Sequence, residues 1–209
     1  MEFRLTYEGP LPATQRNEVG SVRSLKLQRK HGIRRQFHVQ LKRLWEITPF
    51  LNTGARSGSS ALITEESEGP IDLARETLAA KYGQDPWGFV PLVTAQLNLI
   101  CALDVLMLRP HAPGDVISAG DLDNRLKTLF DALRIPVPNE RYAGRSPADD
   151  EKPYFYCLLE DDKLITKVSV ETDQLLEYVS SGANPDDVRL VIKVRLRPYE
   201  LTLDNMQFG

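Results

Sequence analysis

Apolar and polar residues alternate with a period of two in several short stretches of the chain, and this period predicts β-strands. The clearest case is RLVIKVRLRP, residues 189–198, in which Leu190, Ile192, Val194 and Leu196 share one side and three basic residues the other. The stretch EFRLTYEG, residues 2–9, predicts a first strand closed by the turn-forming GPLP. Residues 154–172 predict a strand, an acidic turn and a second strand, and the long apolar run 92–108 predicts a central strand or a pair of strands.

Three other stretches repeat their apolar residues every three or four positions, which is the period of an α-helix. The apolar positions of the first stretch, residues 24–46, are Ile33, Phe37, Leu41 and Leu44. Lys30, Arg34 and Lys42 fall mostly away from these positions, which predicts a helix with one core face and one basic face. Residues 70–83 predict a second helix, and residues 121–133 predict a third with a normal core stripe. The stripe of the third helix consists of Leu122, Leu126, Leu129, Phe130 and Leu133.

These elements predict one domain over residues 1–209, of the α+β class, in which helices pack on a mixed β-sheet. A chain of 209 residues can bury enough apolar surface to fold without disulfides. Two stretches rich in Gly, Ser, Pro and charged residues, at about 48–70 and 136–153, predict surface insertions. Because no stretch approaches about 18 uninterrupted apolar residues, no membrane span is predicted.

Charge is distributed unevenly along the chain, although the formal net charge is only -3. Residues 1–50 hold ten Lys or Arg against four Glu, whereas the remaining residues hold sixteen against twenty-five acids. Such asymmetry fits a region that faces a polyanion, and it fits a solvated basic helix equally well. Cys101 and Cys157 lie in apolar, strand-like stretches, and the first ten residues lack a signal-peptide pattern. Together these features predict buried, reduced thiols in a cytoplasmic protein.

The stretch GDLDNRLKTLFDALR, residues 120–134, gathers charged residues on one flank of the third helix. Asp123, Lys127 and Asp131 follow one another at intervals of four and form a column away from the core stripe. A structural explanation is available, because aspartates near a helix N-terminus favour its dipole and an Asp123–Lys127 ion pair contributes about 0.2–0.5 kcal/mol. Taken alone, this stretch favours the structural explanation.

A second group of acids, Glu160, Asp161 and Asp162, follows an apolar strand, where three negative charges repel one another beside the core. If the helix start meets this strand end, Asp121, Asp123 and one acid of the second group would form a carboxylate site for Mg²⁺ or Mn²⁺. Such a site favours phosphate-ester chemistry, with Lys127 stabilising the charge that develops on the phosphate. These residues do not by themselves distinguish Asp161 from Asp162. The three histidines are scattered and no P-loop or dinucleotide-binding fingerprint is present.

The segment DLDNRLKTLFDAL, residues 121–133, followed by an apolar strand and by EDDKLI, residues 160–165, resembles the signature of RusA-type Holliday junction resolvases. The resemblance implies a RusA-like fold, and it implies metal-binding roles for Asp121, Asp123 and Asp162 and an essential role for Lys127. Supporting positions in the same motifs are Asn124, Asp131 and Asp161. The chain departs from the family in the ISAG that precedes the first motif and in the long stretch between the two motifs.

The resemblance further implies a homodimer that uses Mg²⁺, or Mn²⁺ in its place, to cut four-way DNA junctions by paired phosphodiester hydrolysis. A two-fold dimer suits this reaction because it presents two metal sites to two symmetric strands. The basic side chains expected to contact DNA phosphates are Lys30, Arg34, Arg35, Lys42 and Arg43. Two alternatives stay open: a non-catalytic DNA-binding or scaffold protein of the same fold, and a metal nuclease for other branched or single-stranded DNA.

Overall fold

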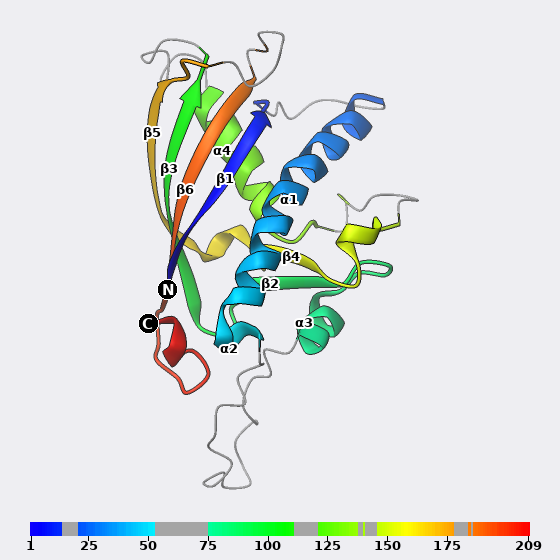
Figure 1. Cartoon of the computed structure of the whole chain (residues 1–209), viewed down its shortest axis with the longest axis vertical. Coiled ribbons are helices and arrows are strands. Elements are labelled where there is room, and N and C mark those ends of the chain that lie inside the picture. The colour runs from blue at the N-terminus through cyan, green and yellow to red at the C-terminus, as the bar shows by residue number, and fades with distance from the viewer. Residues whose placement is uncertain are drawn as a thin grey trace, which may run out of the picture.

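The computed structural model describes residues 1–13, 21–52, 75–110, 121–137, 140, 146–177, 184 and 186–209, with the backbone alone for 21–24 and 121. Its strands and helices confirm the α+β class (Figure 1). The strands are β1 (Glu2–Pro10), β2 (Phe89–Val93), β3 (Leu99–Arg109), β4 (Phe155–Leu159), β5 (Ile165–Gln174) and β6 (Asp187–Pro198). The helices are α1 (Ser21–Ile47), α2 (Pro49–Asn52), α3 (Arg75–Tyr82) and α4 (Asp121–Leu133), with short 3-10 turns η2 (Asp149–Glu151), η3 (Asp162–Leu164) and η4 (Met206–Phe208).

The main sheet is mixed, as predicted, and has the strand order β1-β6-β3-β5. β6 pairs antiparallel with both β1 and β3, whereas β3 and β5 run parallel. β2 and β4 form a separate parallel pair. The apolar run 92–108 is therefore a pair of strands that belong to two different sheets. A turn over residues 94–98 separates them, with Asn98 at a positive φ of 51°.

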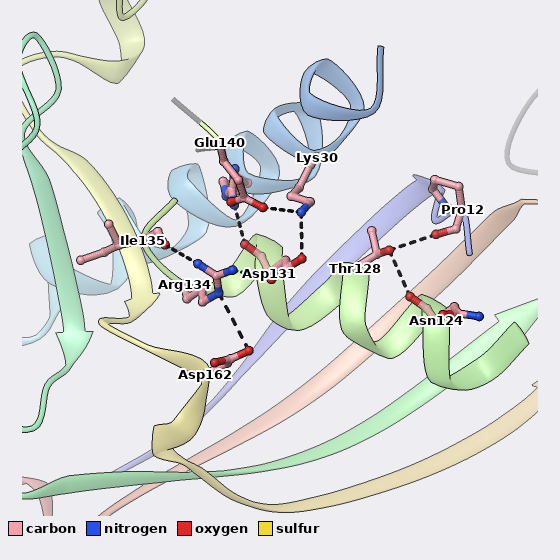
Figure 2. Close-up of polar contacts among 10 residues, drawn as sticks. Pro12, Lys30, Asn124, Thr128, Asp131, Arg134, Ile135, Glu140 and Asp162 are labelled. Carbon is pink, nitrogen blue, oxygen red and sulfur yellow. Dashed lines mark hydrogen bonds and ion pairs between the residues drawn. The ribbon is translucent and has the colours of Figure 1, made fainter. Parts of the chain in front are cut away.

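The inner face of the main sheet carries the core, and α4 lies across this face with α1 beside it (Figure 2). The predicted alternation in β6 is confirmed, because its four inward residues, Leu190, Ile192, Val194 and Leu196, are all buried. The core stripe of α4 is confirmed too, with Leu129 and Leu133 buried and its other members partly buried against the core. Hydrophobic burial of these two faces fixes α4 on the sheet.

The two edge strands of the main sheet, β1 and β5, differ in what covers them. α1 runs along the free edge of β1, and two glutamines of α1 satisfy the backbone groups there. Gln40 accepts a hydrogen bond from the Thr6 N–H at 2.8 Å and donates to the Thr6 carbonyl at 2.7 Å. Gln36 donates to the Glu8 carbonyl at 3.1 Å. In the described part of the chain, no element covers the other edge, which is formed by β5 (Figure 1).

The described parts of the two expected insertions include residues that are anchored in the domain, although most described residues of the second insertion are exposed. Residues 49–52 form α2, and its Leu51 is buried in the core. In the second stretch, Glu140 and Glu151 form close ion pairs with residues of α1. Local sequence patterns do not predict these contacts, because the paired residues lie about a hundred positions apart along the chain. The rest of the first insertion lies outside the described residues.

Cys101 and Cys157 are buried and form no disulfide, as predicted. Burial raises the pKa of both thiols to about 12, so neither ionises near neutral pH. None of the helices in the described ranges has the length and apolar character that crossing a bilayer requires.

His38 of α1 is fully buried and joins α1 to β4 and η2. Its Nδ1 accepts a hydrogen bond from the Tyr156 N–H at 2.9 Å, so its Nε2 carries the proton and donates to the Asp150 carbonyl at 3.1 Å. Burial lowers the pKa of His38 below 6.5, and the Asp150 carbonyl only partly opposes this effect. The imidazole is therefore neutral in the folded protein at neutral pH.

This neutral histidine predicts a loss of stability in mild acid. Below pH 6.5 the unfolded chain binds a proton at His38 that the folded protein does not yet bind, so the free energy of unfolding falls as the pH drops through the folded pKa. We expect denaturant titrations between about pH 7 and pH 5 to show this loss, and we expect His38→Gln to reduce its slope. An unchanged slope in His38→Gln would contradict the assignment.

Candidate functional site

The helix α4 presents three distinct sides. Its apolar stripe packs on the sheet, and a second side points to α1, where Asp131 meets Lys30 at 2.8 Å. At about 100° per residue, Asp123, Lys127 and Arg134 fall within about 40° of one another and define the third side, the charged flank. Because Arg134 reaches toward η3 from this flank, the charged flank lies on the side of α4 where β5 begins.

Asp123 and Lys127 are exposed on the charged flank. Neither makes an ion pair or hydrogen bond with another side chain among the residues that the structure describes, so the expected Asp123–Lys127 pair is not formed. The side chain of Asp121 lies outside the described residues, and its backbone begins α4. Two exposed, oppositely charged side chains one helical turn apart are available to a ligand from solvent.

The three acids of the second group, Glu160, Asp161 and Asp162, each make a different contact. Glu160 accepts a hydrogen bond from the Ala95 N–H at 2.9 Å, and Asp161 caps η3 by accepting from the Lys163 N–H at 3.0 Å. Asp162 is half exposed, and its carboxylate lies 3.9 Å from the Arg134 guanidinium. The repulsion expected among these acids is thus offset locally by backbone donors and nearby cations. Among the three, Asp162 has the greatest freedom to bind something else.

Asp123 and Asp162 lie near opposite ends of α4. Asp162 contacts Arg134, which follows the last residue of the helix, and eleven residues separate Arg134 from Asp123. A rise of about 1.5 Å per residue places Asp123 about 16 Å from Arg134 along the helix axis. One Mg²⁺ holds its ligands at about 2.0–2.1 Å, so a single copy of the chain does not bring both to one ion. In keeping with this, no group of three or more His, Cys, Asp or Glu in the described ranges is arranged to hold a metal.

An ion-pair network ties α4 to α1 and to Glu140 (Figure 2). Lys30 contacts Asp131 at 2.8 Å and Glu140 at 2.5 Å, and Arg34 contacts Glu140 at 2.6 Å. Arg134 contacts Asp131 at 2.6 Å. Burial opposes ionisation of Asp131 and Glu140, but the hydrogen bonds and charges of their cationic partners outweigh it and lower both pKa values. The geometry gives Asp131 a structural role in this network.

The predicted basic face of α1 is wrong in part. Arg34 is only 1% exposed, and Lys30 is held in the same network with little exposure, so neither side chain lies on an exposed basic face. Arg35 is 48% exposed and bonds Asp150 at 2.5 Å. Lys42 is half-buried, whereas Arg43 is exposed and pairs with Glu46. Much of the basic surplus of α1 is therefore neutralised by acids of the same chain, which the charge asymmetry alone could not reveal.

Asn124 and Arg125, which follow Asp123 in α4, make contacts within the fold. The backbone carbonyl of Asn124 accepts a hydrogen bond from the Thr128 hydroxyl at 3.1 Å. Arg125 is buried and contacts Asp186 at 2.9 Å, on a side of α4 away from Asp123. Sequence reasoning missed Arg134, although its spacing of three from Asp131 is a recognisable helical ion-pair signal.

Comparisons with protein-family models, with curated proteins and with solved structures find no match to this chain. The resemblance to RusA-type resolvases therefore rests on the two short motifs alone.

Proposed function

We propose that this protein is a metal-dependent endodeoxyribonuclease of RusA-like fold that resolves four-way DNA junctions in recombination and repair, acting as a homodimer in the cytoplasm. The observation that carries the proposal is the charged flank of α4, which offers Asp123 and Lys127 to solvent at one end and brings Arg134 to Asp162 at the other. A solvent-facing carboxylate and lysine on a packed helix suit phosphate-ester chemistry better than stabilisation of the fold, because neither side chain has a described partner.

The side chains fit Mg²⁺ or Mn²⁺, since both ions prefer carboxylate oxygens and retain water ligands. Asp123 would supply carboxylate oxygens, with Asp121 at the start of the same helix turn, and Asp162 would supply its own at the other end of α4. A bound divalent ion supplies an activated water and neutralises phosphate charge. Lys127, one turn beyond Asp123, would donate to a phosphate oxygen and stabilise the negative charge that builds there.

The non-catalytic alternative requires the acids of α4 to be held by cations of their own helix, Arg125 and Lys127. The geometry disfavours it. Arg125 bonds Asp186 and the Leu11 carbonyl, and Lys127 makes no described contact to Asp123. A nuclease for other branched or single-stranded DNA uses the same residues and differs only in substrate, so the DNA itself must separate it from a resolvase.

The test is cleavage of a labelled synthetic four-way junction beside a linear duplex of matching sequence. We expect paired, symmetric nicks on the junction in Mg²⁺ and none in EDTA, because the carboxylates need the ion to act on the phosphate. Equal cutting of linear or single-stranded DNA would replace the resolvase by the broader nuclease. Junction binding without nicking in Mg²⁺ and in Mn²⁺ would refute the catalytic proposal.

A further inference from the structure

The main sheet has an outer face, opposite the face that carries the core. The register of the strands sets outward-pointing residues of β1, β6, β3 and β5 side by side in rows across this face. In the four rows that run from Glu2 to Glu8 of β1, none of the outward-pointing residues is buried. The side chains of the outer face are therefore accessible to a partner, and their charge indicates the kind of partner.

Charge is divided unevenly between the two ends of the outer face. Five cations lie at the end where β5 begins and form the basic band: Arg4, Lys167, Lys193, Arg195 and Arg197. Only two acids, Glu2 and Asp104, lie in the same rows. Three acids and one cation occupy the rows at the other end: Glu8, Glu171, Asp173 and Arg189. The basic band is thus the positive half of a face whose other half is negative.

The basic band holds more cations than its own acids neutralise. Glu2 contacts Lys193 at 3.0 Å, and Asp104 contacts Arg195 at 2.7 Å. The other three cations of the band are exposed and pair with no acid in the part of the chain that the structure describes: Arg4, Lys167 and Arg197. Cross-strand ion pairs therefore explain only part of the band.

The positions of these cations do not serve the stability of the sheet. Arg4 lies directly opposite Lys193 in the pairing of β1 with β6. Like charges at opposed positions destabilise a sheet. A polyanion bound over the band relieves this repulsion, so the arrangement suits binding better than folding.

We propose that the basic band binds the phosphate backbone of a DNA duplex. Lys193, Arg195 and Arg197 stand in a straight row along β6 at intervals of about 6.8 Å, two steps of the strand rise. Three of the five cations are arginines, whose guanidinium groups bind phosphate oxygens in a bidentate manner. Contacts of this kind position a duplex and do not read its sequence.

Duplex DNA fits the band better than an anionic membrane surface does. Proteins that bind at a membrane surface insert large apolar side chains beside their cations. The apolar residues in the rows of the band are Ile100 and Ala102, and both are half-buried. The band is therefore a charged surface without projecting apolar groups, as contact with a phosphate backbone requires.

The choice of DNA as the polyanion rests on the proposed function. β5 begins directly after η3, and Lys167 follows Asp162 by five residues, so the band lies at the same end of the sheet as this carboxylate. A duplex held on the band lies next to Asp162. The band also provides phosphate contacts that α1 lacks, because Lys30 and Arg34 are held by acids of the same chain.

Salt-dependent binding to a labelled linear duplex in EDTA tests the inference without cleavage. The test variant combines Arg4→Gln, Lys167→Gln and Arg197→Gln. We expect its affinity at about 0.1 M salt to fall roughly 10²-fold, and the slope of log K against log salt to become shallower by about 2–3, since each phosphate contact contributes about 0.9. Because the three side chains are exposed, the variant is expected to unfold at the native denaturant concentration.

The matched control combines Lys81→Gln, Lys152→Gln and Arg189→Gln, which remove the same charge outside the band, and it is expected to keep the native slope. Asp104→Asn tests the opposite direction, because it frees Arg195 from its acid and is expected to raise the affinity roughly threefold. A native slope in the test variant, or an equal loss in the control, would overturn the proposal.

Two further outcomes separate this inference from its alternatives. Duplex RNA or phosphatidylserine vesicles bound through the band more tightly than duplex DNA would overturn DNA as the partner. A protein that binds the duplex through the band and yet nicks no junction in Mg²⁺ or Mn²⁺ would refute the proposed function and support the band. Junction nicking together with native binding by the test variant would do the reverse.

Discussion

Replacing Glu140 by alanine is expected to lower the free energy of unfolding by about 3–5 kcal/mol, because it withdraws a carboxylate from two buried cations. Lys30 and Arg34 contact Glu140 at 2.5 and 2.6 Å, and Arg34 is almost fully buried. Chemical denaturation measures the loss. Glu46→Ala is the matched control, since the Arg43–Glu46 pair is exposed and contributes no more than about 1 kcal/mol.

The same network predicts a partial rescue. Adding Arg34→Met to Glu140→Ala is expected to recover part of the lost stability, because the double variant no longer buries the arginine charge beside a missing carboxylate. If Glu140→Ala cost no more than Glu46→Ala, the interior network would not be a principal link between α1 and α4.

Replacing Lys127 by methionine is expected to reduce junction nicking in Mg²⁺ roughly 10²–10³-fold, the usual effect of removing one donor to a developing negative charge. Because Lys127 lies at the surface, the variant is expected to unfold at the native denaturant concentration. Junction binding in EDTA is expected to change little, since one lysine is a small part of a DNA-contacting surface.

Lys152→Met is the control for this experiment, because Lys152 is also an exposed lysine, paired with Asp149 at 3.2 Å and separate from α4. A parallel loss of binding and nicking in Lys127→Met would reduce Lys127 to a phosphate contact without a role in the chemical step.

Local periodicity predicts those parts of the fold that depend on a single element. The stripe of α4 and the alternation of β6 each set one face against the core, and both faces are buried as predicted. The strand at β4 was predicted, but its pairing with β2 in a separate sheet was not, because all five residues of each strand are buried and no alternation assigns them to a sheet. The contacts of α1 with Glu140 and Glu151 were missed because such ion pairs leave no local pattern.

The separation of Asp123 from Asp162 follows from topology instead of residue type. β3 and β5 run parallel, so the chain must return between them, and α4 makes part of that return. An acid at the start of α4 and an acid just before β5 therefore lie at opposite ends of the sheet. The sequence shows that both acids are present and in which order, whereas only the parallel pairing shows that they lie apart within one copy of the chain.

Removing one motif carboxylate tests the proposed metal-dependent nuclease most directly. Asp123→Asn is expected to abolish junction nicking in Mg²⁺ and to leave junction binding in EDTA near native, because the exposed carboxylate would hold the ion and does not support the fold. Native nicking by Asp123→Asn, from a variant that unfolds at the native denaturant concentration, would contradict the account.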